Sequence, residues 1–330
     1  MGGNTRGYGR RGGAEGAGTP RRRPTVRDVA QAAGVSTAVV SYAFNRPDRV
    51  ASATRERVLA AAASLGYTGP APAGRALRLG RFGIIALAGR GSAEALLADP
   101  AAAQVARGMA RVCDRAGVGL LLSGDSDGAA DGAVVLGDAR GWAGRGPLVA
   151  VGGPAEEGIP VVSADERAGA AAVAAHLARL GHARLAVLSP PGGGARLAGA
   201  REGWGESGPL LAYEAPGPAR ADGEVAARAA LRTRPAPTAL LALSDRLALG
   251  ALDAARHAGL EVPGDLSVAG IDDLPESRAA GLTSVFVPYP PLGELAATLL
   301  IALISGRPLP PAPALPTSLA IRRSTGPPRG

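Results

Sequence analysis

The sequence predicts an α/β protein with an all-helical N-terminal head, a linker, and a two-lobed body of doubly wound parallel sheets. Three observations predict this. Residues 1–81 hold 14 arginines and 4 acidic residues, whereas residues 82–330 hold 22 arginines and 24 acidic residues. Residues 24–67 have the apolar spacing of three short helices. Residues 82–287 alternate short apolar runs with Ala-rich helical stretches, which is typical of parallel sheets covered by helices.

The composition limits the kind of protein and its compartment. Of 330 residues, 46% are hydrophobic but only 3% are aromatic, so the cores must consist of Ala, Val and Leu. No apolar run approaches the roughly 18 residues of a membrane span, and the first residues lack the apolar stretch of a secretory signal. Cys113 is the single cysteine and cannot form an internal disulfide. We therefore expect a soluble cytoplasmic protein without membrane contact.

Residues 1–23 are rich in Gly and Arg and have no periodicity, so we expect a disordered tail. An arginine-rich arm can contact DNA phosphates. The alternatives are a passive tail or a start codon chosen too far upstream.

Residues 24–67 carry the signals of helix ends. Thr25 and Asp28 form a capping box at the first helix, and Gly34 makes the following turn. Ser36 is expected to cap the second helix and Ser52 the third. The residues expected to face inward have helical spacing: Val26, Val29, Ala30 and Ala33, then Val40, Ala43 and Phe44, then Val58, Leu59, Ala62 and Leu65.

Residues 68–81 form a linker that two prolines stiffen, and residues 82–330 form the body. Helices are expected at 166–180, 222–233 and 246–258, and the Pro-rich tail from Arg307 is expected to wrap the surface. Two sets of strands predict two lobes with a cleft between them. The strands are expected at 83–88, 117–122, 132–137, 147–151 and 159–163, then at 183–189, 238–244, 266–271 and 283–287.

Longer motifs resemble one family. "TVRDVAQAAGVSTAVVSYAFN" (25–45) and "VASATRERVLAAAASLGY" (50–67) resemble the helix-turn-helix head of the LacI/GalR family of bacterial transcriptional regulators. "DERAGAAAVAAHLARLGHARLAVL" (165–188) and "LPTSLAIRRSTGPP" (315–328) resemble that family's effector-binding core, a periplasmic-binding-protein-like pair of lobes. The resemblance covers residues 24–330 and is weakest around 120–160 and 190–222.

The resemblance implies that the second helix of the head enters the DNA major groove. Its small side chains can still read bases, because methyl groups pack on thymine methyls and hydroxyls bond several base edges. It lacks a bidentate arginine–guanine contact, worth about 1–3 kcal/mol, so we expect weak readout per half-site. Val39 and Tyr42 are alternatively packing residues within the head. The implied DNA contacts are Val26, Ser36, Thr37, Ala38, Ser41, Tyr42 and Asn45.

The same resemblance implies that the linker folds into a hinge helix in the minor groove. Leu77 is then the apolar wedge at a central base step, and Arg75 and Arg78 suit a narrow, electronegative groove. The linker is one residue longer than the usual spacing and contains Gly74. The alternative is a plain flexible tether.

Polar residues at strand ends predict a ligand site, because ligands of open parallel sheets bind beyond the carboxyl ends of the strands. Asp165, Ser189, Asp245 and Asp272 follow four predicted strands. Their oxygens suit a sugar or a similar polyol. Each acid is alternatively a helix N-cap. By resemblance, Arg196 contacts the effector, with Arg201 as its competitor.

The first lobe departs from the family. Nine residues separate the predicted strands 117–122 and 132–137, fewer than the ten to twelve or more that a parallel crossover with a helix takes. Gly152 stands where the family often has a polar effector contact. We expect a trimmed lobe whose half of the pocket is poor.

These features predict a DNA-binding transcriptional regulator, a repressor that binds a pseudo-palindromic operator as a homodimer and responds to a small polar effector. The alternative is a regulator that has lost its effector response. A solute-binding protein or an enzyme fits less well: the three histidines lack metal-ligand spacing, and "PPGGGAR" (190–196) lacks the ending of a phosphate-binding loop. We expect no cofactor and no metal.

Overall fold

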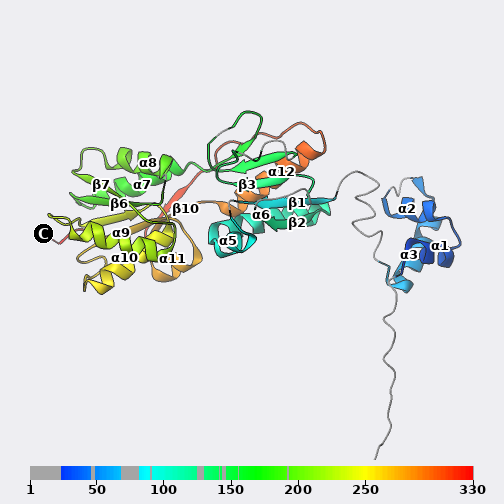
Figure 1. Cartoon of the computed structure of the whole chain (residues 1–330), viewed down its shortest axis with the longest axis horizontal. Coiled ribbons are helices and arrows are strands. Elements are labelled where there is room, and N and C mark those ends of the chain that lie inside the picture. The colour runs from blue at the N-terminus through cyan, green and yellow to red at the C-terminus, as the bar shows by residue number, and fades with distance from the viewer. Residues whose placement is uncertain are drawn as a thin grey trace, which may run out of the picture. The chain divides into compact units, whose positions relative to one another are not determined.

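The computed structural model describes residues 24–45, 49–67, 82–89, 91–124, 130–140, 142, 146–154, 156–191 and 193–329 (Figure 1). Two compact units make up the chain, one within residues 1–80 and the other within 81–330. The predicted tail and the linker, with Arg75, Leu77 and Arg78, lie outside the described residues.

The head consists of α1 (Val26–Ala33), α2 (Thr37–Asn45) and α3 (Ser52–Leu65). The predicted capping box is present: the backbone N–H and the hydroxyl of Thr25 both donate to Asp28 Oδ2, at 2.6 and 2.7 Å. Gly34 follows α1 with φ 62°, a conformation that glycine adopts without a Cβ clash. Ser36 Oγ accepts a hydrogen bond from the Val39 N–H, 3.3 Å away, as predicted for the cap of α2.

Two expectations for α3 are wrong. Ser52 is the first residue of the helix and not its cap, because Ala51 holds the cap position and the Ser52 hydroxyl donates to Glu56 Oε1 at 3.1 Å. Leu65 is 40% exposed, since it lies at the last turn, past the end of the packed face. The buried core of the head is Val29, Ala30, Ala33, Val40, Ala43, Val58 and Ala62.

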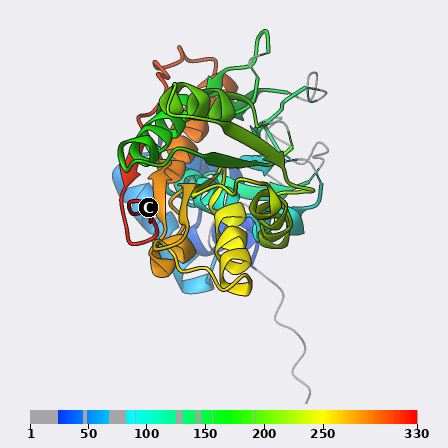
Figure 2. The same ribbon diagram turned by 90° about the vertical axis from the view of Figure 1, so that its left-hand side faces the viewer.

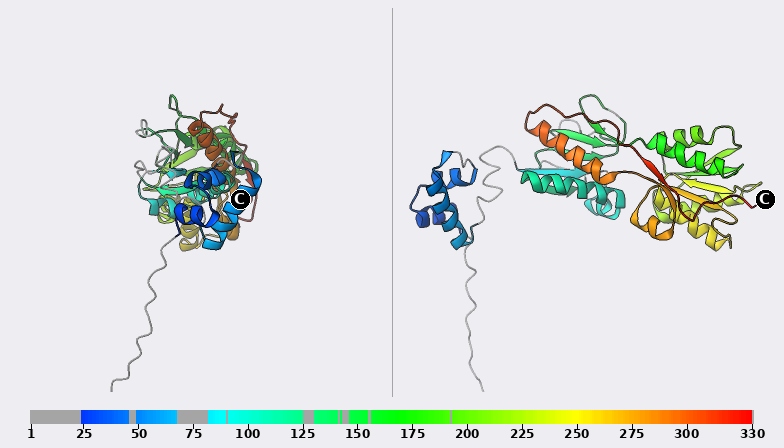
Figure 3. Two further views of the ribbon diagram at one scale, coloured as in Figure 1. Left: turned by 90° about the vertical axis from the view of Figure 1, so that its right-hand side faces the viewer. Right: turned by 180° about the vertical axis from the view of Figure 1, so that it is seen from behind.

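The first lobe of the body has five parallel strands in the order β2-β1-β3-β4-β5. One face packs against α6 and α12, which lie side by side (Figure 3). The strands are β1 (Ile84–Ala88), β2 (Gly119–Ser123), β3 (Ala133–Leu136), β4 (Leu148–Val151) and β5 (Val161–Val162), and the helices are α5 (Ala93–Ala98), α6 (Pro100–Ala116) and α12 (Tyr289–Ile304).

The second lobe has six strands in the order β11-β10-β9-β8-β6-β7. Helices α7 and α8 lie on one side of this sheet, and α9 and α10 lie on the other (Figure 2). The strands are β6 (Leu185–Ser189), β7 (Leu210–Glu214), β8 (Ala239–Ala242), β9 (Ser267–Asp272), β10 (Thr283–Phe286) and β11 (Ser318–Ala320). The helices are α7 (Glu166–Arg179), α8 (Gly194–Trp204), α9 (Arg220–Arg232), α10 (Asp245–His257) and α11 (Pro275–Ala280).

The Pro-rich tail does more than wrap the surface. Its β11 pairs antiparallel with β10, and the segment after it is bonded into the second lobe. Ser324 Oγ donates to the Val268 carbonyl at 2.6 Å, and His182 Nε2 lies 2.9 Å from the Gly326 carbonyl oxygen. The tail therefore completes the sheet.

The connection between β2 and β3 carries no helix at its described residues, 124 and 130–132. Asp131 anchors its end, because both carboxylate oxygens accept backbone N–H groups at the start of β1, from Phe82 at 2.5 Å and Gly83 at 2.7 Å. The sheet face on this side is nevertheless buried: Trp142 is 5% exposed and belongs to the same buried cluster as Ala86 and Val135. A loop tryptophan thus covers a face that a helix usually covers.

Three helix pairs pack through glycines. In α8, a Cβ on Gly199 would lie 2.1 Å from the Arg167 carbonyl oxygen, and one on Gly203 would lie 1.9 Å from the Ala171 carbonyl oxygen, both on α7. The same holds for Gly108 and Gly293 between α6 and α12, and for Gly223 and Gly250 between α9 and α10. Backbone-to-backbone packing of this kind suits a sequence with few large side chains.

Gly203→Ala is therefore expected to destabilise the body by about 1–3 kcal/mol, the usual cost of overpacking. Helix propensity alone predicts the opposite sign, since Ala is favoured over Gly by about 1 kcal/mol in a helix interior. Urea unfolding followed by circular dichroism decides between the two. A more stable variant would contradict the close packing of α7 and α8.

Candidate functional site

The outer face of α2 is open to solvent. Val40 and Ala43 on its inner face are buried, whereas Tyr42 is 43% exposed. This exposure disagrees with the alternative that Tyr42 packs inside the head. Among the predicted DNA contacts on this helix and its cap, Ser36, Thr37, Ala38 and Tyr42 are exposed and Ser41 is half-buried; Val39 is also half-buried, and the side chain of Asn45 lies outside the described part.

Contacts among the three helices hold this face in place. Arg57 Nε, from α3, donates to the Ala33 carbonyl at 3.1 Å and so occupies the C-terminus of α1, where a cation is favourable. The rings of Phe44 and Tyr67 meet edge to face with centroids 5.8 Å apart. Val26 packs partly against the core.

A cavity of about 560 Å³ lies in the body where several strands end. Its lining comes from the segments that follow β4, β6 and β8, and from the first residues of α7 and α8. This is the edge at which open parallel sheets bind ligands. The lining residues are Gly153, Pro154, Glu166, Pro190, Pro191, Gly193, Gly194, Ala195, Arg196, Leu243 and Ser244.

The Arg196 guanidinium is at the centre of a polar network beside this cavity. Nε and Nη2 donate to the two carboxylate oxygens of Glu166, at 3.0 and 2.9 Å. Nη1 donates to the Leu243 carbonyl at 2.7 Å and to Asp272 Oδ1 at 2.9 Å. Nη2 also reaches the Tyr289 hydroxyl at 3.4 Å. A guanidinium has five N–H groups, and each of them has a partner within the protein.

The network continues into the core through two aspartates. The Tyr289 hydroxyl donates to Asp272 Oδ1 at 2.6 Å, and Asp272 Oδ2 accepts from the Asp245 N–H at 3.3 Å. Asp245 in turn accepts from the Ser284 hydroxyl at 2.5 Å and from the Leu274 N–H at 2.8 Å. Asp272 has φ 126°, a backbone strain of about 1–3 kcal/mol that persists where surrounding contacts hold it.

Burial sets the protonation of these carboxyl groups. The pKa of Asp245 is raised from 3.8 to about 7, first by burial and then by the charge of Asp272. Burial also raises the pKa of Asp272, which the charge of Arg196 and the Tyr289 hydroxyl oppose. The pKa of Tyr289 is raised by burial and by the neighbouring Asp272.

Of the five effector residues predicted from sequence, Arg196 lines the cavity, whereas Asp245 and Asp272 belong to its hydrogen-bond network but are buried and are not among the lining residues. Asp165 is exposed and caps α7, with Oδ1 accepting from the Ala168 N–H at 3.0 Å. Ser189 is buried at the end of β6 and its hydroxyl donates to the Pro190 carbonyl at 2.8 Å. Arg201, the competitor of Arg196, is exposed.

Sequence reasoning missed Glu166 and Tyr289. Glu166 directly follows Asp165, so the rule that a polar residue after a strand marks the ligand site came within one residue of it. Tyr289 follows β10, and its position at a strand end is the signal that could have found it.

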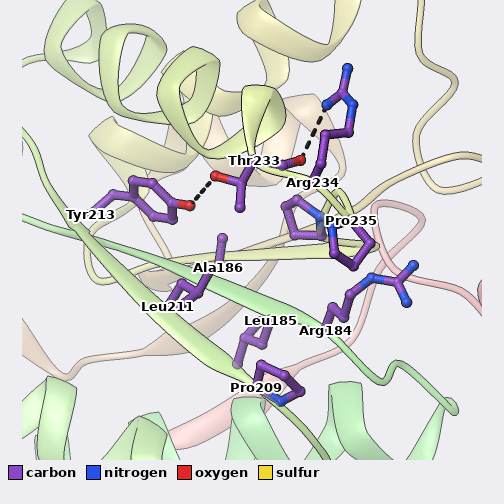
Figure 4. Close-up of a pocket in the computed structure, with 10 residues that line it drawn as sticks. Arg184, Leu185, Ala186, Pro209, Leu211, Tyr213, Thr233, Arg234 and Pro235 are labelled. Atoms are coloured by element: carbon purple, nitrogen blue, oxygen red, sulfur yellow. Dashed lines mark hydrogen bonds between the residues drawn. The ribbon is translucent and has the colours of Figure 1, made fainter.

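A smaller cavity of about 100 Å³ lies against β6 and β7 (Figure 4). Its polar groups already have partners: Tyr213 and Thr233 share a hydrogen bond between their hydroxyls, and Arg184 Nε donates to the Ala236 carbonyl at 2.8 Å. We therefore assign it no site.

Comparisons with known proteins agree with this architecture. Residues 25–69 match the family described as bacterial regulatory proteins, lacI family, and residues 174–325 match the periplasmic binding protein-like domain. The HTH-type transcriptional regulator Rv3575c of Mycobacterium tuberculosis is 34% identical over 94% of this chain and 99% of its own length. The chain belongs to the lacI family.

Two solved structures of transcriptional regulators are similar to this chain over most of its length. The Lac repressor dimer bound to operator and the anti-inducer ONPF is similar with a TM-score of 0.78 and 26% identity, over 92% of this chain and all of that one. A complex of the transcriptional regulator CelR with cellobiose is similar with a TM-score of 0.65 and 29% identity, at the same coverage. The predicted fold class is confirmed, and the protein is a DNA-binding transcriptional regulator.

None of the helices in the described ranges is long and apolar enough to span a membrane.

The buried aspartate gives this regulator a testable pH dependence. A native pKa of about 7 for Asp245 lies above the unfolded value, so the native state binds the proton more tightly. Its contribution to stability is full below about pH 4 and is lost as pH rises through 7, by about 1.4 kcal/mol per pKa unit. In chemical unfolding, stability relative to Asp245→Asn should therefore fall between pH 4 and 7. A difference that stays constant with pH would contradict the buried, protonated state.

Proposed function

We propose that this regulator represses transcription by binding a pseudo-palindromic operator as a homodimer, with α2 of each head in a major groove. The observation that carries the proposal is the exposed face of α2 opposite a closed core. Thr37, Ala38 and Tyr42 are the side chains offered to base edges, and the arginines concentrated in residues 1–81 favour phosphate contacts. Two-fold symmetry of the protein requires two half-sites.

The proposed division of the chain follows from this. Residues 24–67 form the DNA-binding head, residues 68–81 the hinge linker, and residues 82–330 the body that binds ligand and dimerises. The tail 1–23 adds phosphate contacts or is passive. Leu77, flanked by Arg75 and Arg78, supplies the minor-groove wedge.

The proposed effector is a small polar molecule, such as a sugar, bound in the cavity beside Arg196. Glu166 and Ser244 line this cavity and offer oxygens to ligand hydroxyls. The similarity to a regulator solved with cellobiose supports the same class of ligand.

One observation favours a second candidate, a regulator without effector response. Every N–H of Arg196 is already bonded within the protein, so a ligand gains a bond to it only by displacing a protein partner. The connection between β2 and β3, which carries no helix at its described residues, also favours a regulator without effector response. A thermal-shift screen of the full chain against sugars and nucleosides separates the two. Stabilisation by one class favours the first candidate, and no shift with any compound favours the second.

Operator binding can be tested by selecting bound DNA from random duplexes with the full chain. We expect a palindrome with a flexible central step such as CG or TA. Protein that binds no duplex at moderate salt, or binds all of them equally, would contradict the proposed function.

The linker leucine provides a sharper test. Leu77→Ala should weaken binding to the selected operator by about 1–3 kcal/mol, the scale of lost specific contacts, and leave binding to unrelated DNA nearly unchanged. Fluorescence anisotropy on both duplexes measures this. Leu309→Ala is the matched control, because Leu309 is an exposed leucine of the body. An equal loss on both duplexes would show that Leu77 does not act as a wedge.

A further inference from the structure

The chain passes between the two lobes of the body at three crossovers, which all lie within the described residues. The first, residues 163–165, runs from β5 into α7. The second, residues 287–288, runs from β10 into α12, and the third, residues 305–317, runs from α12 into β11. The orientation of one lobe relative to the other depends on the backbone at these three segments.

Hydrogen bonds join the crossovers to one another. The first and third pair through backbone bonds, since the Leu315 N–H donates to the Ser163 carbonyl at 2.8 Å and the Asp165 N–H donates to the Leu315 carbonyl at 2.9 Å. Glu166 is the first residue after the first crossover, and Tyr289 is the first residue after the second. Arg196 Nη2 bonds to both of them, at 2.9 and 3.4 Å.

Arg196 itself belongs to the second lobe, through α8. Its bond to Asp272 ties it to the end of β9, and Asp272 also accepts the Tyr289 hydroxyl. Tyr289 begins α12, which packs on the first sheet. The Arg196 guanidinium and the Asp272 carboxylate, both in the second lobe, therefore connect that lobe to the start of a first-lobe helix. Pro288, Pro290 and Pro291 restrict the backbone on both sides of Tyr289, so this connection acts on a stiff segment.

We propose that Arg196 is a positioning residue that fixes the hinge: it joins two crossovers and holds the lobes in one orientation without any ligand. Glu166 is the partner through which this restraint is regulated, because its side chain lines the cavity and is 35% exposed, whereas that of Asp272 is 8% exposed. A ligand hydroxyl that bonds to Glu166 competes with Arg196 and loosens the first crossover. The restraint itself is independent of the proposed function, and only this link to regulation rests on it.

The restraint can be measured as the distribution of distances between the lobes. Spin labels at Arg115→Cys on α6 and Ser207→Cys after α8, two exposed positions, report the orientation by double electron–electron resonance. Cys113→Ala removes the native thiol. The full chain without ligand should give one narrow distribution. Tyr289→Phe removes the two hydrogen bonds that the hydroxyl makes to charged groups, Asp272 and Arg196, and should raise the population of other orientations by on the order of tenfold or more.

The chain offers a matched control. Arg167 and Glu202 also join α7 to α8 by an ion pair, one residue away from Glu166, but both are exposed and their ion pair links these two helices alone. Arg167→Met should leave the distribution narrow. Arg196→Met, which removes the guanidinium itself, should broaden the distribution as Tyr289→Phe does. Far-UV circular dichroism confirms that each variant is folded, and Tyr289→Phe keeps the test decisive if Arg196→Met does not fold.

Two outcomes would overturn the proposal. One is a Tyr289→Phe distribution as narrow as that of the unsubstituted chain. The other is equal broadening by Arg167→Met, which would mean that any α7–α8 pair sets the orientation. A narrow distance distribution for the unsubstituted chain and a broad one for Tyr289→Phe would support the hinge role of Arg196. This result would stand even if the protein bound no operator.

Discussion

The body of this regulator depends on one buried cation. A charge removed from water is costly unless it is paired and fully hydrogen-bonded, and the Arg196 side chain is only 17% exposed. Its partners come from four different elements: the starts of α7 and α12 and the ends of β8 and β9. Each partner must lie where the planar guanidinium can reach it. The geometry of one side chain therefore constrains the relative positions of segments more than 90 residues apart in the chain, and it does so at the strand ends where the cavity lies.

Most of the fold could be predicted from the sequence because its signals are local. Strands β1, β3, β4 and β8 are continuous apolar runs, since parallel strands are buried on both faces. The predicted helices 166–180, 222–233 and 246–258 agree with α7, α9 and α10 to within two residues. Two strands were not predicted. β7 has only a short apolar run, and it lies at the edge of its sheet with no fully buried residue. β11 is a three-residue strand defined by pairing with β10, a partner distant in sequence.

The site was predictable only in part, for a related reason. The rule that ligand sites lie beyond strand ends selects positions along the chain, and it led to Asp245 and Asp272, which belong to the Arg196 network but do not line the cavity. It does not say which way a side chain points. Asp165 and Glu166 are neighbours at the same strand end, yet one turns back to cap α7 and the other faces the cavity. Tyr289 has an aromatic ring typical of a core residue, and its polar role depends on a hydrogen bond from its hydroxyl to Asp272, 17 residues earlier in the chain.

Composition connects the packing of the body with its hinge. A chain with 49 glycines and few aromatic residues packs its helices backbone to backbone, and close-packed interiors resist gradual deformation. Deforming either lobe therefore costs free energy. A change in the shape of the body has to occur by movement at the crossovers between the lobes. Those segments are short or rich in proline, and the first two end at residues bonded to Arg196. Under the proposed function, a ligand changes the relative orientation of these lobes only through a difference in its affinity for different orientations. Glu166 is the group in this network that we propose provides that difference in affinity, because it is hydrogen-bonded to Arg196 and its side chain also lines the cavity.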